Sequence, residues 1–300
     1  MVRNFEIGIF VINLDRSASR MRSMERQLSS FNLNFTRIRA VDGDRDDITS
    51  EMAGAGLKLG EVNGRPLGPR EIGCYLSHIK AFRAMKRANL EAACILEDDV
   101  ELGANFPLAL RCLSQHCTDN IVAKLEPWPK PRLGVIVGRA GDHRTIYSPQ
   151  GLIETGAYFV TQTAIDAMPD LQTITEPFDH ALFADRQTGP LVVTVSPAAA
   201  KQSDRFQSLI KVDRELGRAT QRRMPRLQRE LCRPFIQLSE FVRAIVRVYE
   251  RLGIKAVLDL RYRRVLTGAV PAAGGAISRA ARPSWPPRIS AQPAFRGDRL

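Results

Sequence analysis

Short apolar runs alternate with amphipathic segments over the first hundred residues. Residues 5–12 and 92–96 are apolar runs, and residues 35–41 have the character of a further strand. Across the segments 17–31 and 69–88, apolar residues recur at steps of three and four. Short apolar runs are typical of buried strands, and such steps are typical of helices. The order strand, helix, strand, helix, strand predicts an α/β domain with a mostly parallel central sheet.

The rest of the pattern is less regular. The connection 45–68 is polar and rich in glycine, so we expect it to be irregular apart from a short helix near 48–57. Residues 128–131, Trp-Pro-Lys-Pro, are predicted to form a loop. We expect further helices at 106–117 and 162–168, and further strands at 121–125, 133–138, 145–148, 156–160 and 191–195.

Three acidic residues, Glu97, Asp98 and Asp99, directly follow the apolar run 92–96. Open α/β sheets bind their ligands at the carboxyl ends of strands. Neighbouring carboxylates repel one another there unless a cation neutralises them, and Mg²⁺ or Mn²⁺ prefers oxygen ligands. Such an ion can clamp the diphosphate of a nucleotide. Successive side chains at a strand end point to opposite faces, so the three cannot all point at one ion. Either Asp98 or Asp99 can therefore support the metal ligands without binding the ion itself. A solvated acidic turn is the alternative interpretation.

Two arginines, Arg16 and Arg20, lie at the turn between the first predicted strand and its helix. Backbone N–H groups at such a turn favour anions, and arginines can add charge-assisted contacts to a phosphate. Two solvated arginines are the alternative. Asp42 and Gly43 follow the second predicted strand, and Asp-Gly is first of all a turn signal. A contact of Asp42 with the ribose or base of a ligand is the second interpretation.

Several further polar or small residues interrupt the apolar pattern. His78 follows Ser77 on the apolar stripe of the helix 69–88, and neighbours on a helix diverge, so the two are not a catalytic pair by adjacency. His78 is either a hydrogen-bonded structural histidine or a ligand or base. Gly156 permits the close approach of a ligand or of backbone. Asp179 with the adjacent histidine forms a second cluster, or else caps a short helix.

Bulk composition is that of a soluble globular chain, with 44% hydrophobic and 25% charged residues among 300. No apolar run approaches the roughly 20 residues of a membrane span, and the first six residues make a poor signal peptide. Five cysteines lack CxxC spacing. We therefore expect free, mostly buried thiols in a reducing cytoplasm, and we expect no zinc site.

The net charge of +12 is concentrated in the last third of the chain. Residues 1–200 carry −2 and residues 201–300 carry +14. Apolar residues repeat at helical spacing over 235–260, with arginines every four residues on another face. Such a helix is typical of an anionic lipid surface, and packing on the main domain is the alternative. Nucleic acid is an unlikely partner, because aromatic residues are sparse and no recognition motif occurs.

These features predict three regions. Residues 1–200 form the α/β domain, and residues 201–265 form a basic helical extension. Residues 266–300 are rich in Gly, Pro, Ala, Ser and Arg, which predicts a disordered tail.

A set of short motifs occurs in a fixed order within the first region. The motifs are Ile12–Arg16 with Arg20, Ala40–Gly43, Glu71–His78, Ile95–Asp99, Gly156–Tyr158 and Pro177–His180. This ordered set resembles glycosyltransferase family 25, the bacterial lipopolysaccharide glycosyltransferases that are related to collagen galactosyltransferases. The resemblance spans about residues 5–200.

The resemblance implies a GT-A-like nucleotide-binding fold and inverting transfer of a hexose from a UDP-sugar, often UDP-galactose. It implies manganese, or magnesium in its place, on Glu97, Asp98 and Asp99, with His180 or Asp179 as a further ligand. Donor binding is assigned to Asn13, Asp15, Arg16, Arg20, Asp42, Ser77, His78 and Gly156. An inverting displacement needs a base for the acceptor hydroxyl, for which Asp179 is the first candidate and Glu154 the second.

The preferred hypothesis is therefore a cytoplasmic, metal-dependent glycosyltransferase at the inner face of a membrane. Its acceptor is a lipid-linked or cell-surface glycan such as lipopolysaccharide. The alternative is a non-catalytic, degenerate glycosyltransferase fold that its basic tail attaches to a membrane or to nucleic acid. The intact acidic triplet at 97–99 argues against degeneracy.

Overall fold

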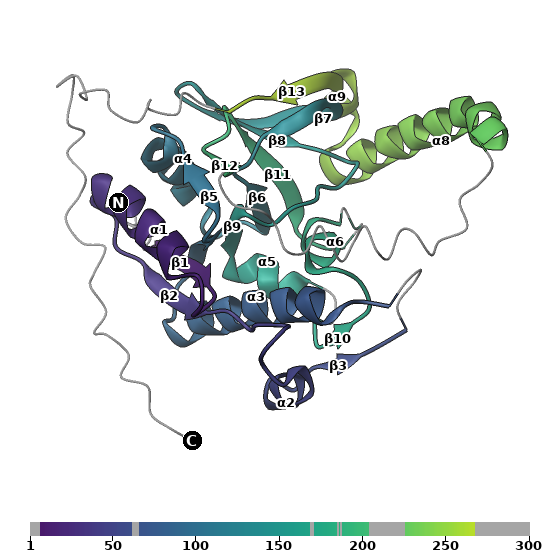
Figure 1. The fold of residues 1–300 in the computed structure, drawn as a ribbon. Coiled ribbons are helices and arrows are strands. Elements are labelled where there is room, and N and C mark those ends of the chain that lie inside the picture. The colour runs from purple at the N-terminus through teal and green to yellow at the C-terminus, as the bar shows by residue number, and fades with distance from the viewer. Residues whose placement is uncertain are drawn as a thin grey trace.

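The structure is a computed structural model that describes residues 7–61, 66–168, 171–184, 186, 188–203 and 226–267. A mixed sheet of nine strands forms the centre of this described part (Figure 1). In pairing order the strands are β13 (Arg261–Val265), β7 (Trp128–Ala140), β8 (His143–Tyr147), β11 (Leu191–Ser196), β6 (Ile121–Lys124), β9 (Ala157–Thr161), β4 (Ala92–Glu97), β1 (Ile7–Asn13) and β2 (Thr36–Arg39).

Six of these nine strands run in one direction. β2, β1 and β4 are mutually parallel, and β6 is parallel to β11. β9 runs antiparallel between β4 and β6, and β8 and β13 are antiparallel to their neighbours. The predicted α/β class and mostly parallel sheet are confirmed. The direction of β9 could not be predicted, because all five of its residues are buried and its pattern is that of any central strand.

Helices cover both faces of the sheet. The helices are α1 (Ala18–Ser30), α2 (Ile48–Gly54), α3 (Pro69–Arg87), α4 (Phe106–Leu113), the 3₁₀ turn η1 (Ser114–His116), α5 (Gln162–Ala167), α6 (Phe178–Phe183), α8 (Arg226–Leu252) and α9 (Ile254–Leu258). Alternate residues of β1 contact opposite faces, as pleating requires. Val11 packs with Met24 of α1 and Phe106 of α4, whereas Ile12 packs with Leu76 of α3.

Two small strand pairs lie beside the main sheet. β3 (Lys58–Leu59) pairs with β10 (Thr173–Ile174), and β5 (Val100–Leu102) pairs with β12 (Ala200–Gln202). The predicted loop at 128–131 is wrong, because these residues belong to β7. Only residues 135–140 of β7 pair with β8, so the proline-containing end has a strand partner on one side alone, where prolines are tolerated.

The basic extension contains α8, α9 and β13, and β13 pairs with β7 in the main sheet. Figure 1 shows α8 reaching away from the sheet at its N-terminal end. None of the helices in the described ranges has both the length and the apolar character needed to cross a bilayer. Residues 204–225 and 268–300, and with them most of the predicted disordered tail, lie outside the described residues.

The register of the parallel strands brings the functional motifs together. Ile12 of β1 is paired with Glu97 of β4, so the turn after β1 and the acids after β4 leave the sheet at the same edge. α3 begins beside this edge at Pro69, which suits a first helical position. Its first turn is capped by Glu71, whose carboxylate accepts the Gly68 N–H at 3.1 Å.

Candidate active site

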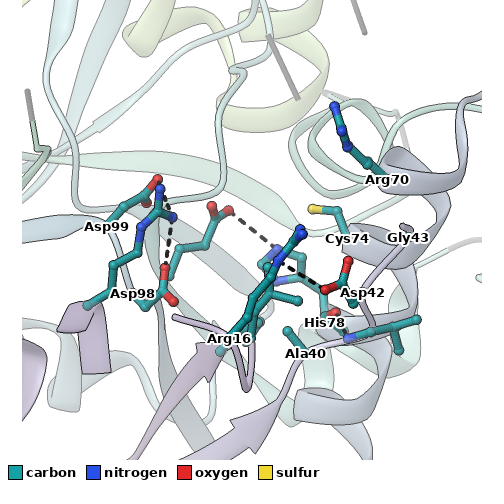
Figure 2. A pocket seen from close by; sticks show the side chains of 15 residues that line it. Arg16, Ala40, Asp42, Gly43, Arg70, Cys74, His78, Asp98 and Asp99 are labelled. Carbon is teal, nitrogen blue, oxygen red and sulfur yellow. Dashed lines mark hydrogen bonds and ion pairs between the residues drawn. The ribbon is translucent and has the colours of Figure 1, made fainter. Parts of the chain in front are cut away.

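A pocket that is partly open to solvent lies at the carboxyl ends of β1 and β4 (Figure 2). Open α/β sheets bind their ligands at this edge. Eight of the residues predicted from the sequence line it. They are Arg16, Arg20, Asp42, Ser77, His78, Glu97, Asp98 and Asp99. The sequence reasoning missed two further polar lining residues, Arg70 and Cys74, which lie on the first turns of α3.

Asp98 is tied to the turn after β1. The Asn13 amide donates to one carboxylate oxygen of Asp98 at 2.6 Å, and Arg20 donates to the other at 3.2 Å. Burial raises the pKa of Asp98, and these two donors oppose that rise. With both oxygens engaged, Asp98 joins the two strand ends and holds Arg20 at the pocket wall.

Asp99 is the least satisfied of the three acids. It is 5% exposed, and its Oδ1 has no hydrogen-bond partner among the described residues. Arg20 lies 3.6 Å from its other oxygen. Burial, followed by the charge of Glu97, raises the pKa of Asp99 to about 7. A buried carboxylate oxygen without a partner is costly, and a cation would satisfy it.

Glu97 has more polar neighbours than Asp99 has. The Thr155 hydroxyl donates to its Oε1 at 2.7 Å, and the Nε2 of His78 lies 3.6 Å from the same oxygen. Burial opposes ionisation of Glu97, but His78, Thr155 and the charge of Lys124 together hold its pKa below the ordinary value. Glu97 is therefore ionised beside Asp99, at the floor of the pocket.

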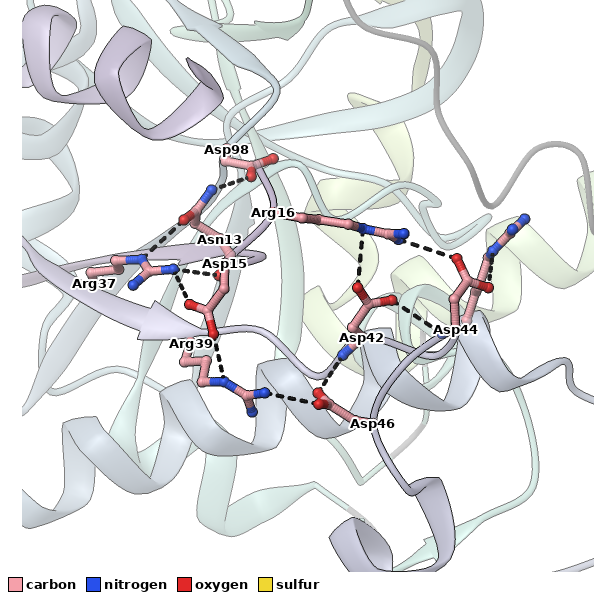
Figure 3. Close-up of polar contacts among 10 residues, drawn as sticks. Asn13, Asp15, Arg16, Arg37, Arg39, Asp42, Asp44, Asp46 and Asp98 are labelled. Carbon is pink, nitrogen blue, oxygen red and sulfur yellow. Dashed lines mark hydrogen bonds and ion pairs between the residues drawn. The ribbon is translucent and has the colours of Figure 1, made fainter. Parts of the chain in front are cut away.

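The turn after β1 is shaped by a network of arginines and acids (Figure 3). Arg37 donates to the Asn13 side-chain oxygen at 2.9 Å and to Asp15 at 2.6 Å, and Arg39 donates to Asp15 at 2.8 Å. These hydrogen bonds lower the pKa of Asp15. Asp15 is exposed and is not among the lining residues. The structure thus brings Asn13 to the acids but leaves Asp15 outside the pocket.

Arg16 crosses the pocket mouth to the turn after β2. Its guanidinium lies 3.0 Å from Asp42 and 3.2 Å from Asp44. Asp42 also accepts the Asp44 N–H at 3.1 Å, so it stabilises the predicted turn and also lines the pocket. Arg16 is more accessible than Arg20, with 26% of its side chain exposed against 19%.

Ser77 and His78 have different roles although they are neighbours on α3. Ser77 accepts the Val41 N–H at 2.9 Å and donates to the Gly73 carbonyl at 2.6 Å, which fastens α3 to the end of β2. The His78 Nδ1 is 2.9 Å from the Tyr158 hydroxyl, and its ring stacks on Phe178 at 4.3 Å. These contacts fix the ring so that Nε2 points at Glu97.

Comparison with known proteins finds similarity over this part of the chain. Residues 6–133 match the family model described as "Glycosyltransferase family 25 (LPS biosynthesis protein)". The chain is thus similar to glycosyltransferase family 25 over somewhat less than half of its length. The resemblance predicted from the ordered motifs is confirmed, and the first four motifs lie within the matched range.

Relatives of known name share the family 25 segment. Procollagen galactosyltransferase 1-B of Xenopus laevis is 32% identical over 131 residues, which cover 42% of this chain and 21% of that protein. A glycosyltransferase 25 family member of Drosophila melanogaster is 33% identical over 113 residues, 36% of this chain and 18% of that protein. The chain thus spans about a fifth of the length of these relatives. Mannose-1-phosphate geranyltransferase of Thermus thermophilus aligns with a TM-score of 0.31 at 11% identity, over 66% of this chain and 75% of its own.

Four predicted site residues lie beyond the family 25 segment. Glu154 is exposed, with a backbone φ of +70°, and its N–H donates to Asp179 at 3.3 Å. Asp179 is buried and also accepts the His180 N–H at 3.1 Å, whereas His180 is exposed. None of the three is among the described residues that line the pocket. Thr155, which follows Glu154 in the chain, donates to the pocket residue Glu97.

Gly156 provides close approach, but to a protein side chain. A Cβ at this position would lie 2.7 Å from Glu126 Oε1 and 3.0 Å from Val100. Glu126 is buried and ion-paired with Lys124 at 2.6 Å, and Lys124 also donates to the Glu154 carbonyl at 2.8 Å. Burial raises the pKa of Glu126. This buried pair, which the sequence reasoning missed, positions the loop 154–156 behind Glu97. The signal was a lysine inside the apolar run 121–125.

Proposed function

We propose that this protein is a metal-dependent glycosyltransferase that moves a hexose from a UDP-sugar to a glycan acceptor. The observation that carries the proposal is the pocket that Arg16 and Arg20 line together with the acids at the carboxyl end of β4. Positive groups for a diphosphate and carboxylates for a cation lie together at the ligand-binding edge of an α/β sheet. The match of residues 6–133 to the family 25 model supports the reaction class, and the galactosyltransferase relatives support galactose as the sugar.

The residues present fit a hard divalent cation. Asp99 offers a buried carboxylate oxygen that lacks a partner among the described residues, and Glu97 offers an ionised carboxylate beside it. Both are ligand types that Mn²⁺ and Mg²⁺ prefer. When bound, the ion would stabilise the negative charge that develops on the departing diphosphate. Asp98 is engaged by Asn13 and Arg20, so we assign it to positioning, and His180 lies outside the pocket lining.

Other residues of the chain bind the donor and activate the acceptor. Arg16 and Arg20 bind the diphosphate, and each exchanges part of its present ion pairing with Asp42 or Asp99 for phosphate oxygens. Asp42 stands at the mouth of the pocket for the ribose or base. An inverting displacement needs a base within reach of the acceptor hydroxyl. We propose Glu154, the exposed carboxylate, as that base, and Asp179 as the residue that positions its backbone.

The direct test is release of UDP from UDP-galactose and UDP-glucose in the absence of an acceptor. We expect hydrolysis with Mn²⁺ and none after chelation, because the diphosphate leaves poorly without a cation. GDP- and CMP-sugars serve as controls and should remain intact. A folded protein that releases no nucleotide from any of these donors would contradict the proposal and favour a non-catalytic binding protein.

We further propose that the enzyme works at an anionic membrane surface, on a lipid-linked or lipopolysaccharide acceptor at its inner face. α8 exposes an apolar stripe at helical spacing, formed by Leu238, Val242, Val246 and Tyr249. Ala244 and Val248 bury the adjacent stripe against the body. Arg243, Arg247 and Arg251 lie on the same helix and add positive charge. An exposed apolar stripe with arginines is the pattern of an interfacial helix.

Vesicle binding tests this surface. Ser239→Asp and Val246→Asp add the same negative charge to α8, but only the second interrupts the stripe. One added charge should weaken binding to phosphatidylglycerol vesicles about fivefold, or about 1 kcal/mol. Val246→Asp should weaken it about tenfold further, or about 1.5 kcal/mol, through lost apolar burial. Equal binding by the two variants, or equal binding of the native chain to neutral phosphatidylcholine, would contradict the proposal.

A further inference from the structure

Three potential metal ligands of different chemistry converge on one side of the pocket. Cys74 and His78 lie one helical turn apart on α3 (Figure 2). Glu97 comes from the end of β4 and lines the same pocket. One ligand atom of each lies within 4.8 Å of the others. Residues four apart on a helix project to the same side. The cluster combines a thiol, an imidazole and a carboxylate, which is a different donor set from the oxygens of Asp99 and Glu97.

The distances fit a tetrahedral ion. Zinc bonds of about 2.0–2.3 Å place neighbouring ligand atoms roughly 3.3–3.8 Å apart in a tetrahedral site. The Nε2 of His78 and the Oε1 of Glu97 are 3.6 Å apart. That distance is too long for a hydrogen bond, yet it is the spacing that a shared ion requires. Cys74 is half-buried, so its side chain can close the remaining gap by rotation.

Two of the three ligands are oriented by outer hydrogen bonds. The His78 Nδ1 contacts the Tyr158 hydroxyl at 2.9 Å, which leaves Nε2 to face the cluster. The Thr155 hydroxyl donates to Glu97 at 2.7 Å. Metal-binding histidines and carboxylates are usually held by such partners, which fix the ring and the carboxylate for the ion. The ring of His78 is also immobilised by its stacking on Phe178.

The cluster is open on the side of the pocket. Cys74, His78 and Glu97 all line it, so three protein ligands leave the fourth tetrahedral position to water or to a ligand. Thiolate and imidazole favour zinc-class ions over magnesium or manganese. We propose that Cys74, His78 and Glu97 form a three-ligand, open site for a borderline-soft divalent cation of the zinc class. The site shares Glu97 with the carboxylates proposed above for Mn²⁺, but its thiolate ligand allows it to be tested without the transfer reaction.

Titration with Co²⁺ tests the site, because a cobalt–thiolate bond gives a charge-transfer absorption that oxygen ligands do not. The native chain should bind one equivalent with this absorption and with the visible bands of tetrahedral cobalt. Cys74→Ser should lose the charge-transfer band. Cys94→Ala is the matched control, since Cys94 lies on the same strand as Glu97 but packs in the cluster on the opposite face of the sheet. It should keep the band.

Two further measurements separate a metal site from a structural cluster. Tyr158→Phe should weaken cobalt binding at least tenfold while the far-ultraviolet circular dichroism stays native, because only the orientation of His78 is affected. Zinc should displace the cobalt, and a large excess of magnesium should not. The proposal is overturned by a folded native chain without a thiolate band, by a band that persists in Cys74→Ser, or by displacement by magnesium as easily as by zinc.

Discussion

Substitution of Asp99 by Asn should lower metal-dependent hydrolysis of the UDP-sugar about a thousandfold, or roughly 4 kcal/mol of transition-state stabilisation. Asp99 provides the buried oxygen that lacks a partner among the described residues. An amide in its place can contact a cation through one neutral oxygen only, so the charge that holds the ion against the diphosphate is lost. Steady-state release of UDP over a range of Mn²⁺ concentrations measures the effect.

A matched Asp→Asn variant and a measurement of thermal stability serve as controls for the Asp99 substitution. Asp166→Asn makes the same chemical change on the exposed surface of α5 and should leave the rate unchanged. In the folded state the pKa of Asp99 is about 7, above its ordinary 3.8. The free energy of unfolding therefore falls as the pH rises from 3.8 to about 7, because Asp99 ionises more readily in the unfolded chain. The metal-free Asn variant should therefore unfold at the same or a higher temperature at pH 7. A fully active Asn variant would remove Asp99 from the proposed metal site.

Substitution of Lys124 by Met should destabilise the protein by about 3–5 kcal/mol, the usual cost of breaking a buried ion pair. Both side chains of the Lys124–Glu126 pair are 3% exposed. Without the lysine, Glu126 keeps a buried charge near Glu97, and the Glu154 carbonyl loses its donor. Urea unfolding, followed by circular dichroism, gives the change in free energy.

A second pair provides the comparison for Lys124. Lys201 and Glu101 are 3.1 Å apart but partly exposed, with 32% and 24% of their side chains accessible. Lys201→Met should cost less than 1 kcal/mol. The double variant Lys124→Met with Glu126→Gln should recover part of the stability, because the unpaired carboxylate is removed. Equal costs for Lys124→Met and Lys201→Met would show that the buried pair does not hold the loop 154–156 in place.

The sequence predicted the pocket residues that follow β1 and β4, but it did not predict the position of the loop 154–156 behind Glu97. β1 and β4 are short apolar runs that end in polar residues, and parallel strands bring such ends together, so the acids and Arg16 could be assigned from the pattern alone. The loop 154–156 could not be placed, because its position depends on the antiparallel β9 and on the Lys124–Glu126 pair. The pair reaches this loop and the start of β9 through hydrogen bonds between residues about 30 apart in the chain.

The roles of individual polar residues were harder to predict than their location. Asp15 lies in the expected turn, yet Arg37 and Arg39 of β2 hold it outside the pocket. Cys74 was treated as one of several free thiols, because no CxxC spacing marked it. Its partner Glu97 comes from another element. Side-chain partners across elements are set by strand register and helix rotation, which periodicity does not reveal.

Thermal unfolding in the presence of UDP, with and without Mn²⁺, tests the central claim most directly. A ligand that binds only the native state raises its stability, by about 2.7 kcal/mol at 100 times the dissociation constant. We predict a rise in Tm when UDP and Mn²⁺ are present together, little change with either alone, and little change with GDP or CMP. A folded sample whose Tm responds to no nucleotide, or responds to UDP equally after chelation of metal, would contradict a metal–diphosphate site at Glu97 and Asp99.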